Sequence, residues 1–114
     1  MEGSLTENKI ARIRALNDLF RSTFEGGRMV LTQGVSSLGQ IFILAALAEV
    51  KMFDAFTEEN DPYGEHDFGS FKIEGRMLFW KISYYAPDME HGSEDASVPE
   101  QTTRVLTIML ADEY

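Results

Sequence analysis

An alternating stretch near the middle of the chain places the strongest constraint on its fold. The pattern takes a period of two over residues 68–73 and again over residues 76–85, which is the period of a β-strand. In the first run Gly69, Phe71 and Ile73 alternate with Phe68, Ser70 and Lys72, and in the second Leu78, Trp80, Ile82 and Tyr84 alternate with Met77, Phe79, Lys81 and Ser83. Glu74 and Gly75 separate the two runs, and a two-residue connection with glycine is typical of a tight hairpin turn. The sequence therefore predicts an antiparallel hairpin. The face of its second strand that we expect to be buried carries Leu78, Trp80, Ile82 and Tyr84.

Two helices are expected before this hairpin. Apolar residues recur every three or four positions along the first part of the chain, which predicts an amphipathic helix near residues 5–25 that ends at Gly26 and Gly27. The stripe consists of Ile10, Ile13, Leu16, Phe20 and Phe24. A continuous apolar run, residues 41–48, predicts a second helix near residues 37–55, mostly buried and capped by Ser36 or Ser37.

Two further segments have the composition of strands. Residues 28–32 are short, rich in strand formers and bounded by glycines, and residues 102–110 place Leu106, Ile108 and Leu110 on one face. The predicted fold is a single α+β domain over residues 1–114, with two helices packed on one face of a mainly antiparallel sheet of about four strands. The position of strand 28–32 in that sheet is left open.

Composition excludes several classes of protein. The 114 residues contain no cysteine, which excludes disulfides, thiolate catalysis and cysteine-bound zinc. No apolar run reaches the roughly 20 residues that span a membrane, and the N-terminus does not have the pattern of a secretion signal. We therefore expect a cytoplasmic protein.

The net charge of −9 is concentrated in two connections of the predicted fold. Residues 54–67, here called the first acidic loop, contain six Asp/Glu, and residues 86–101, the second acidic loop, contain five; neither contains Lys or Arg. Binding to nucleic acid depends on Lys and Arg that neutralise phosphates, so we expect no direct nucleic-acid ligand. Cationic protein surfaces are the expected partners.

Several segments together resemble a known family. They are residues 60–69, Leu78-Phe79-Trp80-Lys81-Ile82, Tyr84-Tyr85, Gly92-Ser93-Glu94-Asp95 and residues 103–111, with Arg14-Ala15-Leu16-Asn17-Asp18 similar to the N-terminal block. They resemble a family of small bacterial proteins catalogued as domain of unknown function thirty-seven sixty-eight. Members often lie on plasmids or other mobile elements, so the resemblance implies an accessory gene, including genes that blunt host defence. It implies no catalytic residue.

Two chemical alternatives involve the histidines of the acidic loops. His66 and His91 with Glu65, Asp67 or Glu90 have the ligand types of a zinc, manganese or iron site, although no helical two-histidine spacing occurs. His66, Asp67 and Tyr63 have the acid and base groups of a metal-dependent hydrolase or nuclease-like enzyme, but no nucleophile elbow or phosphate loop accompanies them. Histidines beside acids are more often solvated or bonded to a carboxylate, so we expect no metal, no cofactor and no catalytic residue.

The favoured hypothesis treats the carboxylates and nearby aromatic side chains as a binding surface for a basic partner. The expected partner-binding residues are Asp61, Tyr63, Glu65, His66, Asp67, Tyr85, Glu90, Glu94 and Asp95. With the resemblance, this surface suggests a mobile-element-encoded inhibitor, of anti-CRISPR or anti-restriction type, that occupies the basic surface of a nucleic-acid-binding complex. The plain alternative is that acidic loops only keep a small protein soluble. The oligomeric state is left open.

Overall fold

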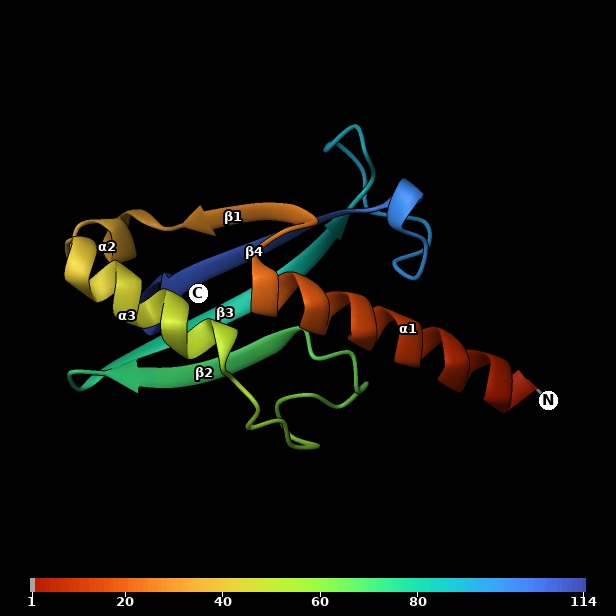
Figure 1. The fold of residues 1–114 in the computed structure, drawn as a ribbon, viewed down its shortest axis with the longest axis horizontal. Coiled ribbons are helices and arrows are strands. Elements are labelled where there is room, and N and C mark those ends of the chain that lie inside the picture. The colour runs from red at the N-terminus through yellow and green to blue at the C-terminus, as the bar shows by residue number, and fades with distance from the viewer. Residues whose placement is uncertain (1) are drawn as a thin grey trace.

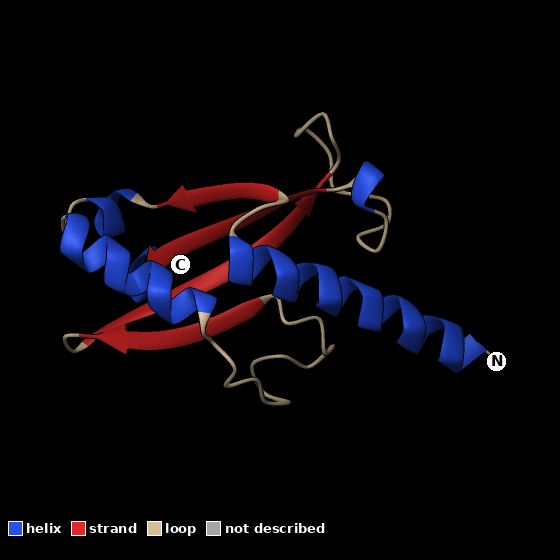
Figure 2. Ribbon diagram, in the orientation of Figure 1, coloured by secondary structure: helices blue, strands red, loops and turns tan. Residues whose placement is uncertain are grey.

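The computed structural model describes the backbone of residues 2–114 and the side chains of residues 6–114. Three helices and four strands make up the regular structure (Figure 2). In chain order they are α1 (Glu2–Thr23), β1 (Gly27–Leu31), α2 (Gln33–Ser36), α3 (Gln40–Lys51), β2 (Phe68–Ile73), β3 (Arg76–Tyr85) and β4 (Thr103–Leu110). Two short 3-10 turns, η1 (Pro99–Gln101) and η2 (Ala111–Glu113), flank β4.

The four strands form one sheet in the order β1-β4-β3-β2. β2 and β3 pair antiparallel, with Gly69 opposite Trp80, and β3 pairs antiparallel with β4. The turn residues Glu74 and Gly75 both have positive φ angles, 51° and 79°, as a type I′ hairpin turn requires. The predicted hairpin and the predicted α+β fold are thus confirmed. β1, whose position was left open, is an edge strand that runs parallel to β4.

The helices pack on one face of this sheet (Figure 1). Burial of apolar surface drives this packing, and the buried core joins helix residues to the inward face of β3 and β4. Its members are Phe20, Val35, Phe42, Ala46, Val50, Leu78, Trp80, Ile82, Leu106 and Ile108. The expected apolar faces of β3 and β4 are confirmed at Leu78, Trp80, Ile82, Leu106 and Ile108, while Tyr84 and Leu110 are partly buried.

The predicted second helix needs three corrections. α3 begins at Gln40 after Gly39, whose φ of 93° suits glycine, and it ends at Lys51. Neither serine caps it: the short helix α2, missed from the sequence, is capped by Thr32 instead. Finally, α3 is not mostly buried, because only one side of it faces the sheet.

The other face of the sheet carries a smaller aromatic cluster. Phe68 of β2 and Phe79 of β3 lie with ring centroids 5.3 Å apart, and the C-terminal Tyr114 packs edge-on against both. The Lys81 ammonium lies over the Tyr114 ring, 5.7 Å from its centroid. Among residues 2–114, no helix has both the length and the apolar character needed to cross a membrane.

Candidate functional site

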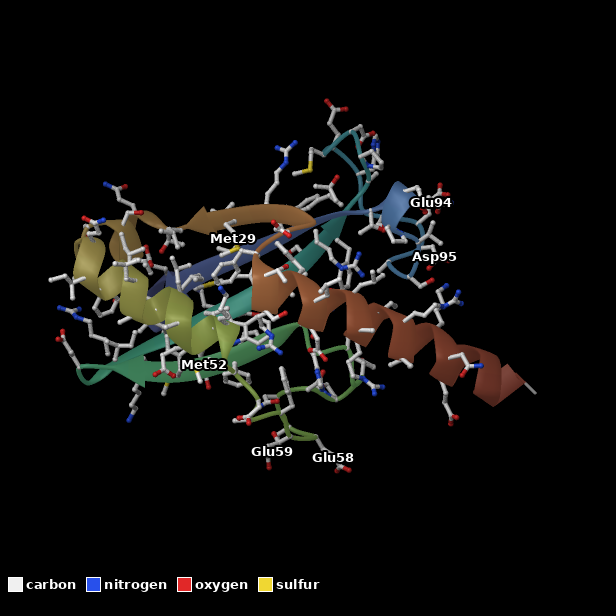
Figure 3. All side chains as sticks on the ribbon, viewed as in Figure 1. Met29, Met52, Glu58, Glu59, Glu94 and Asp95 are labelled. Carbon is white, nitrogen blue, oxygen red and sulfur yellow. The ribbon has the colours of Figure 1, made fainter. Side chains whose placement is uncertain are left out.

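Helix α1 lies between the two acidic loops. It runs beyond the end of the sheet (Figure 1), and the loops lie on either side of it. In Figure 3, Glu58 and Glu59 of the first acidic loop lie on one side of α1, and Glu94 and Asp95 of the second lie on the other. The labelled carboxylates of the two loops therefore lie on opposite sides of α1.

A buried asparagine in α1 joins the two acidic loops. The Asn17 amide is fully buried, and its Nδ2 donates to the main-chain oxygen of Glu65, at 3.0 Å, and to the Tyr84 hydroxyl, at 2.8 Å. Its Oδ1 accepts from Nε of Arg104, at 2.7 Å. Arg104 also donates to the main-chain oxygen of Ala96 in the second acidic loop. One side chain thus connects the first loop, strand β3, strand β4 and, through Arg104, the second loop.

Charge and burial reinforce this network. The Tyr84 hydroxyl donates to the Glu65 carboxylate at 2.7 Å. Burial, and then this bond to Glu65, raises the pKa of Tyr84, so it stays a neutral donor at physiological pH. Burial lowers the pKa of Arg104, while the negative charge of Glu65 acts in the opposite direction. Because buried polar groups are costly when unpaired, this network holds both loops firmly against α1.

Two further contacts attach the acidic loops to α1. Nε of Arg14 donates to the main-chain oxygen of Gly64, at 2.7 Å, in the first loop. Nζ of Lys9 lies 3.4 Å from the Asp95 carboxylate in the second loop. This ion pair is largely exposed, and such pairs contribute at most about 1 kcal/mol. The second loop is therefore attached to α1 mainly through the buried Asn17–Arg104 network.

The predicted histidine, His66, lies inside a second polar cluster. Its Nδ1 is 2.9 Å from the Asp18 carboxylate of α1, and its Nε2 is 3.7 Å from the Asp61 carboxylate. Its main-chain N–H donates to Asp61, and its φ of 56° is rare for a residue other than glycine. The Phe56 ring stacks on the imidazole with centroids 3.7 Å apart and planes nearly parallel. Both ring nitrogens and one ring face of His66 thus contact groups of the protein itself.

Arg21 extends this cluster to helix α3. Its Nη2 pairs with Asp18 at 3.1 Å, and its Nη1 donates to the main-chain oxygens of Val50, at 3.0 Å, and Phe53, at 2.7 Å. A guanidinium at the C-terminal end of a helix satisfies carbonyls that lack partners within the helix and matches the helix dipole. Arg21 therefore fixes α1 to the end of α3, where the first acidic loop begins.

The arrangement around His66 favours a structural role over general acid–base catalysis. A catalytic base must reach a proton of the substrate, yet Asp18 and Asp61 flank the two nitrogens of His66. Burial, followed by the charge of Glu65, raises the pKa of neighbouring Asp67 above its usual 3.8. No phosphate-binding loop or nucleophile elbow accompanies these groups in the sequence.

The second acidic loop contains one group of possible metal ligands. Asp88, Glu90 and His91 lie close together, and all three are exposed. Asp88 accepts from the main-chain N–H groups of Glu90 and His91, and its other oxygen lies 2.8 Å from Nδ1 of His91. These bonds lower the pKa of Asp88 and belong to a local turn. His66 is not part of this group, so the structure does not bring together the two histidines of the metal alternative.

A shallow hollow also opens on the second acidic loop. It has a volume of about 310 Å³, and three carboxylates contribute to its lining, those of Asp88, Glu94 and Glu100. The remaining lining comes from Ala86, Pro87, His91, Gly92 and Gln101. A hollow lined by both carboxylates and apolar groups suits the methylenes and cationic head of a lysine or arginine side chain.

Comparison with protein families identifies the chain. The family model described as "Protein of unknown function (DUF3768)" matches residues 31–113. The protein belongs to this family. The match includes both acidic loops, Tyr84 and Arg104, whereas α1 precedes it, and so does the resemblance of residues 14–18. Neither a curated protein nor a solved structure matches the chain.

The nine residues predicted to bind a partner differ in their exposure to solvent. Tyr63, Tyr85, Glu90 and Glu94 are exposed. Glu65, His66, Asp67 and Asp95 are partly exposed. Asp61 does not lie on the surface as expected. Only 5% of its side chain is exposed, because its carboxylate turns inward and accepts from the N–H of His66. The structure therefore removes Asp61 from the surface.

Three residues at the centre of the site were missed from the sequence. Asn17 and Arg21 are buried on α1 at the helical spacing set by Ile13 and Phe20, and neither belongs to the apolar stripe predicted from the sequence. Arg104 occupies the central strand β4. A polar residue at an apolar position of a periodic helix is a detectable signal, and Asn17 has it. No comparable signal in the sequence identifies the partners of Arg104.

Proposed function

We propose that this protein is a non-enzymatic interaction module that binds a basic protein surface through the exposed carboxylates of its two acidic loops. The observation that carries the proposal is the Asn17–Arg104 network, which attaches both loops to one helix. Charges on ordered loops lose less conformational entropy on binding than charges on flexible tethers. The two loops therefore act as one prearranged acidic surface.

The exposed carboxylates are suited to this role. In the first acidic loop they belong to Asp54, Glu58 and Glu59, and in the second to Asp88, Glu90, Glu94 and Glu100. The acid-lined hollow supports the proposal independently, because it is a suitable pocket for one cationic side chain of the partner. Surface charge of one sign steers oppositely charged partners and speeds their association.

The partner class follows from the same chemistry. A surface of clustered carboxylates resembles the phosphates of a nucleic acid in charge, so it competes for the basic channels of nucleic-acid-binding complexes. We therefore propose an inhibitor of a host nucleic-acid-processing or defence complex, of the anti-CRISPR or anti-restriction type. Its genetic setting would be a mobile element, as the resemblance implies. The protein would act by occupying the basic surface.

Affinity capture with two charge-reversed variants tests this proposal. The loop variant carries Glu58→Lys, Glu59→Lys, Glu94→Lys and Glu100→Lys. The control variant carries Glu25→Lys, Glu49→Lys, Glu74→Lys and Asp112→Lys, four exposed positions outside the loops, so both variants reach the same net charge. Each variant is used as bait in a nuclease-treated host lysate, and captured proteins are identified by mass spectrometry.

The expected result is a basic, nucleic-acid-binding protein that is captured by the wild type and by the control variant and lost with the loop variant. Its binding should weaken as salt rises, because screening shortens the range of surface charges. Equal capture by all three proteins, or no basic protein with the wild type, would show that the loops serve solubility alone.

A further inference from the structure

Helix α3 exposes an apolar stripe that the fold leaves uncovered. Ile41 is 87% exposed, Leu44 57% and Met52 79%, and the small residues Ala45 and Ala48 between them are exposed as well. Their spacing of three, four and seven positions places all five on one side of the helix. The opposite side carries the buried residues Phe42, Ala46 and Val50. α3 is thus apolar on both sides, as in a helix packed between two layers.

The stripe is complementary to an uncharged partner surface. Across residues 33–53 the only charged side chains are Glu49 and Lys51, so this part of the molecule is neutral although the chain carries −9. A basic partner attracted by the acidic loops finds no matching charge on the stripe. Exposed apolar surface on a soluble protein commonly marks a site of protein association. A neutral apolar helix is the natural counterpart.

We propose that α3 is the interface of a two-fold symmetric homodimer in which the α3 helices of two copies pack antiparallel. The stripe is nearly symmetric about a point between Ala45 and Ala48, so an antiparallel copy places Ile41 opposite Met52. The two alanines at the centre allow close approach of the helices. A two-fold interface requires such a self-complementary surface.

A groove at one end of the stripe supports the antiparallel direction. It has a volume of about 280 Å³ and lies between α3 and the β2–β3 turn. Its lining residues are Leu38, Ile41, Phe42, Ala45, Ile73, Glu74 and Arg76. Met52 projects at the other end of α3, so an antiparallel copy brings each Met52 to the groove of its partner. Methionine is flexible and fills irregular apolar spaces well.

Electrostatics favours the same direction. The first acidic loop begins just after α3, so parallel packing would place two such loops side by side. Antiparallel packing separates their starting points by about the length of the helix, roughly 18 Å for 12 residues. That distance exceeds the screening length of about 8 Å at physiological salt. Arg76 in the groove is also placed to face Glu49 and Asp54, which flank Met52 of the other copy.

The size of the stripe predicts a dimer of moderate affinity. A standard stable interface buries about 800 Å² on each partner, and a 12-residue helix supplies only part of that area. The groove beside the β2–β3 turn widens the contact. We therefore expect a dissociation constant in the micromolar range, weaker than that of a standard stable interface.

Sedimentation velocity on the whole protein tests the dimer, from about 1 to about 100 μM, a range that spans micromolar affinity. The wild type should shift from monomer to dimer with concentration. Ala48→Glu places a charge at the two-fold centre and should stay monomeric, while Ala15→Glu, the same change at an exposed position of α1, should dimerise like the wild type. The loop variant defined above should also dimerise, since its changes lie outside α3.

A covalent test covers the case in which Ala48→Glu disturbs folding. The chain has no cysteine, so Ala48→Cys introduces a single thiol next to the two-fold axis. Mild oxidation should convert this variant to a disulfide-linked dimer, and Ala15→Cys should remain monomeric. A wild type that is monomeric throughout, or a folded Ala48→Glu variant that dimerises fully, would overturn the proposal.

Discussion

Replacing Arg21 with alanine should lower the free energy of unfolding by about 3 kcal/mol. Arg21 is 6% exposed and lies between α1, the end of α3 and the aromatic rings of Phe56 and Trp80. Its Nη1 donates to the main-chain oxygen of Val50, which also accepts from the N–H of Phe53, and to the main-chain oxygen of Phe53 just after α3. The substitution removes these donors and the contacts with both rings.

The magnitude follows from opposing contributions. Hydrogen bonds to a charged group contribute about 1.5–3 kcal/mol each, and Arg21 makes two such bonds, a buried one to the Val50 carbonyl and a partly buried one to the Phe53 carbonyl. Removing the guanidinium also removes the cost of burying its charge, which offsets part of this loss. The ion pair with Asp18 adds little, because the Asp18 side chain is 41% exposed and keeps its contact with His66.

Urea unfolding followed by circular dichroism measures the effect. Arg12→Ala is the matched control, since Arg12 is exposed on the same helix, and surface substitutions usually change stability by less than about 0.5 kcal/mol. If Arg21→Ala and Arg12→Ala lowered the free energy of unfolding equally, Arg21 would not hold α1 to α3 as described.

Two further substitutions test packing and charge. Gly69→Ala should destabilise by about 1–3 kcal/mol, because a Cβ there would overlap Trp80 and lie 2.7 Å from the Phe53 ring. Thermal unfolding measures this against Gly92→Ala, where the nearest atom to an added Cβ is 4.0 Å away. Asp67→Asn should raise the urea midpoint at neutral pH, because burial and Glu65 raise the pKa of Asp67 in the folded state. The ionised carboxyl lowers stability above that pKa and has no effect below 3.8, so the gain should vanish in acid; a gain that persists there would refute the stated cause.

Local patterns predicted the hairpin and the inward faces of its strands well. Period-two alternation and the turn at Glu74 and Gly75 are properties of adjacent residues, and β2 and β3 begin and end where they were expected. The parallel pairing of β1 with β4 could not be predicted, because it joins residues 27–31 to residues 104–108. Such non-local pairing depends on how the intervening helices pack, which no local pattern encodes.

The sequence did not predict the exposed side of α3 or the polar centre of the site, and the two misses have different causes. An apolar helix looks the same in the sequence whether a second layer comes from its own chain or from another molecule, so the helix was expected to be mostly buried, whereas Ile41 and Met52 are exposed. The acidic loops were located from charge alone, but the inward turn of Asp61 depends on the backbone conformation at His66. Arg104 was missed because one of its partners, Asn17, is 87 residues away in the sequence and the other, Ala96, lies in an irregular loop.

Hydrogen–deuterium exchange of the Asn17→Ala variant tests most directly whether one helix holds both acidic loops. The account predicts faster exchange in both loops, for example at His66 in the first and at Ser97 and Val98 in the second, whose N–H groups are hydrogen-bonded within the loops. Amides of β4 should change only by the loss of global stability measured in urea. Asn8→Ala, at an exposed position of α1, should leave both loops as in the wild type. Faster exchange in only one loop, or in neither, would contradict the claim that Asn17 joins them into one ordered acidic surface.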